Sequence, residues 1–205
     1  MVGNKKDSFY RLQAKGRTDI MRLVLAVFGL AVLVGTAGAT IPDAGLCSVD
    51  PLDEIGGMLV CPDPPAAFAE FTVNVRNGDN EPIPDAFVEL VFGVPGNHTF
   101  CASAVLTGTT DAMGNVTFNV TAGGCTEAAD AVRIVANSVE IRSYDFVKSP
   151  DFDGASDGEV VLSDFIVFGG AYSTGAGGCH DYDANGSTEL PDFIVFGQGW
   201  GHACQ

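Results

Sequence analysis

The sequence predicts a mainly β chain, in which an antiparallel β-sandwich is followed by a small α-helical module. Residues 67–145 alternate apolar and polar side chains in short runs separated by turn residues, which is typical of half-buried strands. Residues 146–205 contain the hexapeptide Asp-Phe-Ile-Val-Phe-Gly twice, at 164–169 and 192–197, each time after an acidic, glycine-containing loop. A duplicated loop and helix predicts two structurally equivalent halves.

The N-terminal segment, residues 1–39, has the pattern of a secretory signal peptide. Arg22 precedes an apolar run at 23–34, and Ala37-Gly38-Ala39 has the small residues of a cleavage site. Met21 is an alternative start, because residues 1–20 are polar and basic. A retained N-terminal anchor is the competing interpretation, although the apolar run is short for a membrane span. We expect a secreted or cell-surface protein with no stable membrane span after cleavage.

The charge of the remaining chain excludes one class of partner. Residues 1–39 hold six of the 10 Lys and Arg residues and two of the 26 Asp and Glu residues, so the rest of the chain has a formal net charge of −20. Such a surface repels the phosphate backbone. We therefore expect no nucleic-acid partner.

All six cysteines follow residue 39, which indicates an oxidising compartment. Six cysteines allow fifteen pairings. Proximity in the sequence favours Cys47–Cys61, Cys101–Cys125 and Cys179–Cys204. The proline-rich segment 40–66 is then predicted to be an irregular lead-in pinned by the first of these disulfides. A zinc site is the rival interpretation, but the chain has no C-x-x-C spacing.

Residues 67–145 are predicted to form the sandwich from six or seven short strands. The alternating apolar positions are Phe71, Val73, Val75; Val116, Phe118, Val120; and Val132, Ile134, Ala136. Turn residues lie between the runs at 77–80 and 111–115. The segments 75–88 and 110–118 resemble the immunoglobulin-like and carboxypeptidase-regulatory-like domains of bacterial surface proteins. That resemblance implies a spacer or adhesive module without catalysis.

The loop before the second hexapeptide has the spacing of a twelve-residue calcium loop. Side-chain oxygens fall at positions 1, 3, 5, 9 and 12, a backbone carbonyl is expected at 7, and Gly186 at position 6 permits the sharp turn. The candidate ligands are Asp181, Asp183, Asn185, Ser187, Glu189 and Asp192. Position 12 is an aspartate, where the usual EF-hand has a bidentate glutamate.

The loop before the first hexapeptide is less regular and allows two registers. Counting back from Asp164 places Asp153 at position 1 but puts Ala155, which cannot ligate, at position 3. Aligning Asp151 with Asp181 instead needs a two-residue insertion, and we prefer it because it keeps the Asp-aromatic-Asp start. The candidate ligands are Asp151, Asp153, Asp157, Glu159 and Asp164. We thus expect two calcium ions, against the alternative of acidic turns without metal.

A short helix with one apolar stripe is predicted after each loop. The stripes are Phe165, Phe168, Tyr172 and Phe193, Phe196, Trp200, at the spacing of one helix face. We expect the two stripes to pack face to face with pseudo-twofold symmetry. Trp200 is then a core residue rather than a sugar-stacking platform. The apolar residues off the stripe, Ile166, Val167, Ile194 and Val195, would either form an interface or cover the sandwich.

A duplicated loop with an exit helix but no entry helix resembles the type I dockerin module over about residues 151–205. The resemblance implies calcium binding and noncovalent attachment to a cohesin domain on a scaffold or cell surface. Dockerins usually have Ser-Thr pairs at loop positions 10 and 11, where this chain has Leu162-Ser163 and Leu190-Pro191.

Nothing in the sequence predicts catalysis. There is no G-x-S-x-G motif and no phosphate-binding glycine loop. The three histidines, His98, His180 and His202, are expected to be solvated. We therefore expect a non-enzymatic secreted or surface protein that binds calcium and attaches to a cohesin-like or other surface protein. The alternative is a small carbohydrate- or substrate-binding module in which calcium is purely structural.

Overall fold

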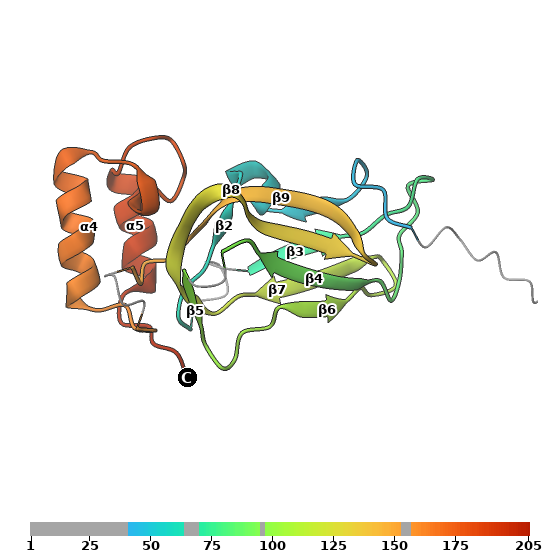
Figure 1. Ribbon diagram of the computed structural model, residues 1–205, viewed down its shortest axis with the longest axis horizontal. Helices are drawn as coiled ribbons and strands as arrows, with labels where there is room; N and C mark the ends of the chain where they lie inside the picture. Colours follow the sequence, from blue (N-terminus) through green and yellow to red (C-terminus); the bar gives the residue numbers. More distant parts are fainter. Residues whose placement is uncertain (1–40, 64–69, 95–96, 153–156) are drawn as a thin grey trace, which may run out of the picture. The chain divides into compact units, whose positions relative to one another are not determined.

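The computed structural model describes residues 41–63, 70–94, 97–152 and 157–205 (Figure 1). All of them belong to one compact unit, Ala39–Gln205. The predicted signal peptide and the candidate ligand Asp153 lie outside the described residues.

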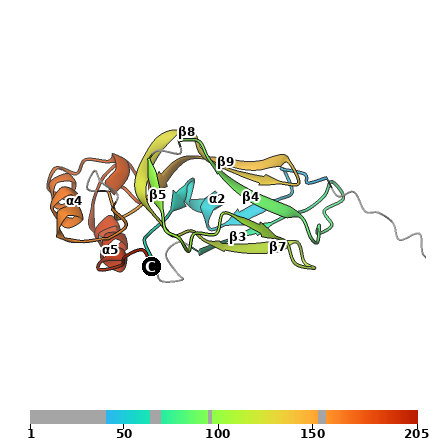
Figure 2. The ribbon, with the colours of Figure 1, turned by 60° about the horizontal axis from the view of Figure 1, so that its bottom comes forward.

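The described chain is mainly β, as predicted, and its strands form two sheets (Figures 1 and 2). The three-stranded sheet has the order β1 (Ser48–Asp50), β3 (Glu70–Asn74), β7 (Asn115–Asn119). The larger sheet has the order β2 (Met58–Leu59), β9 (Val139–Lys148), β8 (Ala122–Ala136), β4 (Phe87–Phe92), β6 (Thr107–Thr109), and β5 (His98–Phe100) also pairs with β8. The β2–β9 pair is parallel, and the other pairs are antiparallel.

The predicted alternation accounts for the core between these sheets. Phe71, Val73 and Val75 are buried, while the polar residues between them are partly exposed. The ring of Phe71 stacks on that of Phe118, with centroids 5.5 Å apart. These side chains share one apolar cluster with Val132, Ile134 and Ala136 of β8. Because side chains alternate between the faces of a strand, the sequence period of two decides which residues meet in this core.

The lead-in to the sandwich is held by strand pairing and by an arginine. The prediction that this segment is irregular and pinned by a disulfide was therefore wrong. It contains β1, a helix α2 (Leu52–Ile55) and β2. Arg142 on β9 donates from Nε to Asp53 Oδ1 at 2.8 Å, and Tyr144 Oη donates to the same oxygen at 2.7 Å. Partial burial opposes ionisation of Asp53, but these hydrogen bonds hold its pKa below the ordinary value. Arg142 also donates to backbone carbonyls of the lead-in, at Ala44 and Cys47.

The two disulfides join residues far apart in the sequence, so the pairing expected from proximity was wrong. The bonds are Cys101–Cys204 and Cys125–Cys179, with sequence separations of 103 and 54. Cys47 and Cys61 are free and buried, and they belong to different apolar clusters. Proximity failed because the fold brings η1 (Gly178–His180) to Cys125 on β8, and the end of the chain to Cys101, which directly follows β5.

Two helices follow the sandwich, α4 (Leu162–Thr174) and α5 (Leu190–Gly199), and they lie side by side (Figures 1 and 2). Neither these helices nor any other in the described part of the chain has the length and apolar run needed to cross a membrane. Strand β9 continues to Lys148, and both disulfides connect the sheets or their loops to the part of the chain that contains the helices.

Candidate metal centre and helix face

The second acidic loop gathers three carboxylates. Ligand atoms of Asp181, Asp183 and Asp192 all lie within 4.8 Å of one another. Asp181 and Asp192 are buried, and Asp183 is exposed. Gly186 has a φ of 94°, which a residue with a Cβ resists. This glycine allows the loop to turn its backbone N–H onto Asp181 Oδ2 at 2.8 Å.

Asp192 closes this loop and caps α5. Its Oδ1 accepts the backbone N–H of Tyr182 at 2.6 Å, and its Oδ2 accepts that of Glu189 at 2.8 Å. A buried carboxylate is stable only when such donors compensate its lost hydration. One side chain therefore ties the start of the loop to the start of the helix.

The remaining candidate ligands lie around the mouth of the loop. Asn185 Nδ2 donates to Asp183 Oδ2 at 3.1 Å and to Glu189 Oε1 at 2.9 Å. Slight desolvation of this exposed side chain, together with the charges of Asp192 and Asp181, raises the pKa of Asp183. Clustered carboxylates repel one another, and a bound cation would remove that repulsion. The set of hard oxygen donors fits Ca²⁺.

The first loop repeats the same hydrogen bonds around Asp164. Its Oδ1 accepts the N–H of Phe152 at 2.9 Å, and its Oδ2 accepts the N–H of Val161 at 2.9 Å. Gly158 N donates to Asp151 Oδ2 at 2.9 Å, as Gly186 N does to Asp181 in the second loop. Asp151 thus corresponds to Asp181, which is the alignment with the two-residue insertion.

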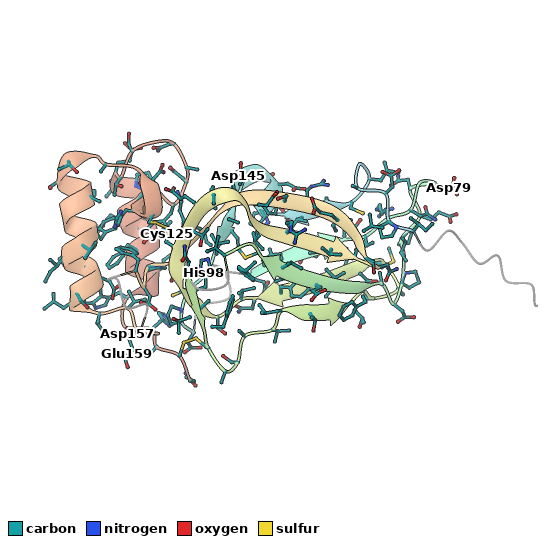
Figure 3. The ribbon with its side chains drawn as sticks, in the orientation of Figure 1. Asp79, His98, Cys125, Asp145, Asp157 and Glu159 are labelled. Atoms are coloured by element: carbon teal, nitrogen blue, oxygen red, sulfur yellow. A yellow bond between two sulfur atoms is a disulfide. The ribbon has the colours of Figure 1, made fainter. Side chains whose placement is uncertain are left out.

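The first loop brings fewer described carboxylates together than the second. Val161 occupies the place that Glu189 has in the second loop, so no oxygen side chain is available there. Asp157 and Glu159 are exposed (Figure 3), and Asp157 Oδ1 accepts the N–H of Glu159 at 3.2 Å. Within the described residues, no group of three ligand side chains forms at this loop.

The two apolar stripes pack face to face, as the duplication predicted. The rings of Phe168 and Phe196 stack with centroids 4.8 Å apart. The neighbouring contacts come in pairs related by exchange of the helices. Phe165–Phe196 and Phe168–Phe193 are both 6.1 Å, Phe165–Trp200 is 5.8 Å and Tyr172–Phe193 is 6.2 Å.

Only the middle of each stripe is buried, and the expected core position of Trp200 was wrong. Phe168 and Phe196 are buried, whereas Trp200 is 48% exposed. Two short helices cover only the centre of their shared face. The other exposed apolar side chains of the helix pair are Leu162, Phe165, Ile166, Val167, Tyr172, Leu190, Phe193 and Ile194. Of the residues off the stripe, Val195 packs against the apolar cluster around Phe168.

Two apolar hollows flank the contact between the helices. One of about 390 Å³ is lined by Leu162, Phe165, Phe193, Phe196, Gly197 and Trp200. The other, of about 330 Å³, is lined by Leu190, Phe193, Phe165, Phe168, Gly169 and Tyr172. A shift of 28 residues along the sequence converts one lining into the other, so the hollows are pseudo-twofold equivalents.

Each hollow is lined by a helical glycine that the fold itself does not require. A Cβ built on Gly169 or on Gly197 has nothing within 4 Å. Glycine inside a helix costs about 1 kcal/mol relative to alanine. A larger side chain at either position would therefore project into open space rather than against the rest of the described structure.

Sequence reasoning missed Lys148 and misplaced His98. Lys148 Nζ, at the end of β9, donates to the carbonyl of Asp181 and pairs with Glu127 at 3.1 Å. A lone lysine in a strand pattern carries no signal for such a role. His98 is buried rather than solvated, with Nε2 2.9 Å from Thr126 Oγ1, and burial lowers its pKa.

Comparisons with known proteins add little. No protein-family model matches the chain, and the curated proteins contain no match. Among solved structures, the chain is similar to a chain from a complex described as a C-terminal interface mutant of a type II cohesin–X-dockerin complex from Acetivibrio cellulolyticus. The identity is 18%, and the match covers 72% of this chain and 95% of that chain with a TM-score of 0.26. A TM-score this low carries no argument about fold or function.

Proposed function

We propose that this chain is an exported, non-catalytic protein whose C-terminal module binds calcium and attaches to a protein partner. The observation that carries the calcium proposal is the cluster of Asp181, Asp183 and Asp192, on a loop with glycine at its sixth position. The two disulfides fit an extracellular compartment. In this proposal the helical module is dockerin-like and the sandwich is immunoglobulin-like.

Calorimetric titration of the full chain with calcium, after chelator treatment, tests the metal proposal. We expect two binding events, of which the tighter belongs to the second loop and is lost in Asp183→Ala. A thousandfold excess of calcium over the dissociation constant should stabilise the fold by about 4 kcal/mol. Asp79→Ala, an exposed carboxylate in the turn at 77–80, is the matched control. Absence of binding heat together with an unchanged unfolding midpoint would refute the proposal.

The helix pair is the surface that we propose for attachment. The exposed surface of α4 and α5 carries no charged side chain, because Asp164 and Asp192 are buried and both helices lack Lys and Arg. Ile166 is 66% exposed and lies among other uncovered apolar residues. Exposed apolar patches of this kind mark interaction sites. We propose a cohesin-like or other surface protein as the partner.

Leucine side chains placed in the hollows should block a partner without destabilising the fold, so they distinguish an effect on binding from an effect on folding. Gly169→Leu and Gly197→Leu place side chains into open space, so the helices should become more stable by roughly 1 kcal/mol. The same variants should lose a partner that seats apolar side chains in the hollows. Gly170→Ala is the control, since its Cβ also meets nothing within 4 Å but it lines neither hollow. Partner recovery from surface extracts, followed by titration with the purified partner, measures the loss. Full binding by both leucine variants would exclude the hollows as the contact.

Carbohydrate binding is the second candidate, and the exposure of Trp200 favours it. Its hollow, however, is lined by aliphatic and aromatic residues and a glycine, and none of their side chains except the indole N–H can bond a sugar hydroxyl. Sugar sites combine a stacking ring with convergent polar groups. Affinity electrophoresis in soluble polysaccharides would establish this function if Trp200→Ala abolished a measured retardation.

A further inference from the structure

Lys148 places a buried positive charge beside the second acidic loop. Only 1% of the residue is exposed. Its Nζ donates to the backbone carbonyl of Asp181, pairs with Glu127 Oε1 at 3.1 Å, and lies 4.4 Å from the centroid of the Phe146 ring. Burying an ammonium is costly unless such partners surround it. The side chain is therefore fixed, and so is the carbonyl that it holds.

Lys148 is one of two adjacent residues of the large sheet that hold the start of the second acidic loop. In the β8–β9 register Lys148 lies opposite Cys125. Cys125 forms the disulfide with Cys179, two residues before Asp181. Cys125 on β8 and Lys148 on β9, which are paired in the sheet, therefore hold Cys179 and Asp181 in place.

The first loop is held at the equivalent atom by a different group. The carbonyl of Asp151 accepts the backbone N–H of Gly124 on β8 at 2.7 Å. Asp151 and Asp181 are equivalent residues of the two loops, so both loops have their first carbonyl bound by the large sheet. A lysine side chain does for the second loop what a strand N–H does for the first.

We propose that Lys148 is a positioning residue for calcium at the second loop, an inference that rests on the proposed function. Its contacts in the described part of the chain are the Asp181 carbonyl, the Glu127 carboxylate and the Phe146 ring, none of which is a candidate ligand side chain. By donating a hydrogen bond to the Asp181 carbonyl, Lys148 fixes the backbone of the residue whose side chain occupies loop position 1. Calcium affinity of the second loop therefore depends on a residue of the sandwich, and the two parts of the chain act as one binding unit.

The sign of the effect separates positioning from simple electrostatics. A cation near a calcium site lowers affinity by repulsion, so removing it would raise affinity. Loss of positioning would lower affinity, and loss of residues that orient metal ligands typically costs about 10- to 100-fold. Glu127, which pairs with Lys148 at 3.1 Å, stays in place in Lys148→Met, so electrostatics alone predicts a rise in calcium affinity and positioning predicts a fall.

Calorimetry of the full chain with calcium, comparing wild type with Lys148→Met, is the first measurement. We expect the second-loop affinity, identified by its loss in Asp183→Ala, to fall about 10- to 100-fold, with first-loop affinity unchanged. A wild-type chain that binds no calcium would overturn the proposed function and this inference with it. A binding wild type with unchanged or higher affinity in Lys148→Met would overturn the inference alone.

Amide hydrogen exchange in chelator gives a readout that needs no metal. The N–H groups of Asn185 and Gly186 bond the Asp181 carboxylate, so their protection should drop in Lys148→Met. The N–H of Gly158, bonded to Asp151, is the internal control and should keep its protection. If Gly158 loses protection equally, the variant has loosened the whole fold and the positioning role is refuted. Glu127→Gln, which keeps the lysine, should leave protection of Asn185 and Gly186 in place.

Discussion

The two halves of the helical module share their caps and differ in what their loops are built to hold. Asp164 and Asp192 accept equivalent pairs of backbone N–H groups. The second loop adds a cluster of three carboxylates. The first loop is two residues longer. Its Asp151 packs so closely against β8 that a Cβ added to Gly123 would lie 1.8 Å from Asp151 Oδ2. The comparison teaches that a duplicated unit can keep its helix caps and its attachment to the sheet in both copies while only one copy gathers three carboxylates.

Breaking the disulfides separately is expected to give the largest effects. Cys125→Ser with Cys179→Ser opens a crosslink of separation 54, and Cys101→Ser with Cys204→Ser opens one of 103. Each should lower the free energy of unfolding by about 4 kcal/mol, because the unfolded chain gains freedom. Urea unfolding measures this.

Calcium titration of the same two variants sharpens the comparison. Cys179 precedes the second loop, whereas Cys204 N donates to the first-loop carbonyl of Gly158 at 2.7 Å. Only the first variant should weaken the second site. Equal weakening by both variants would show that the loops are not separately anchored.

Removing the closing aspartates should have the next largest effect. Asp164→Ala leaves at least two backbone N–H groups without their acceptor, and Asp192→Ala leaves three. We expect a cost of roughly 2–4 kcal/mol for each variant. In chelator the two variants should lose similar stability in urea unfolding. With calcium present, Asp192→Ala should lose more, because it also removes a ligand of the tighter site. A larger calcium-dependent loss in Asp164→Ala would reverse our ranking of the loops.

These features differ in how far the sequence could predict them. Strand alternation, the turn at 111–115, the glycine at loop position 6 and the closing aspartates depend on local spacing, and the structure has them where spacing placed them. The disulfides and Lys148 depend on which strands pair, and no local pattern encodes strand order. The exposure of Trp200 depends on how much of a stripe a ten-residue helix covers. Helical spacing says that residues share a face, but not how wide the covering surface is.

Gly123→Ala should disturb the first loop and leave the second intact. The added methyl group would clash with the buried Asp151 carboxylate, which is fixed by Gly158 N. Overpacking of this kind costs typically about 1–3 kcal/mol. The matched control is Gly170→Ala, whose Cβ meets nothing and which should stabilise slightly. Chemical unfolding together with calorimetry checks both effects. A loss of second-loop affinity without loss of first-loop affinity would contradict the assignment of Asp151 as the anchor.

Asp183→Ala should give the smallest change in stability, and its sign should depend on calcium. Asp183 is exposed, so its removal creates no cavity. In chelator, removal relieves repulsion among Asp181, Asp183 and Asp192, the repulsion that helps to raise the pKa of Asp183, and stability should rise by less than about 1 kcal/mol. In calcium the same change removes a ligand and stability should fall, because the stabilisation by mass action shrinks as the dissociation constant grows.

The matching variant in the first loop is Asp157→Ala, which removes an exposed carboxylate outside any described cluster. It should change stability little in chelator and less than Asp183→Ala in calcium. Thermal unfolding of both variants in the two conditions provides the four values needed. If the change in stability has opposite signs in chelator and in calcium for Asp183→Ala alone, then the carboxylates of the second loop repel one another and a bound cation relieves that repulsion. The same sign in both conditions would mean that the cluster is an ordinary acidic turn, and the two loops would then differ only in their attachment to the sheet.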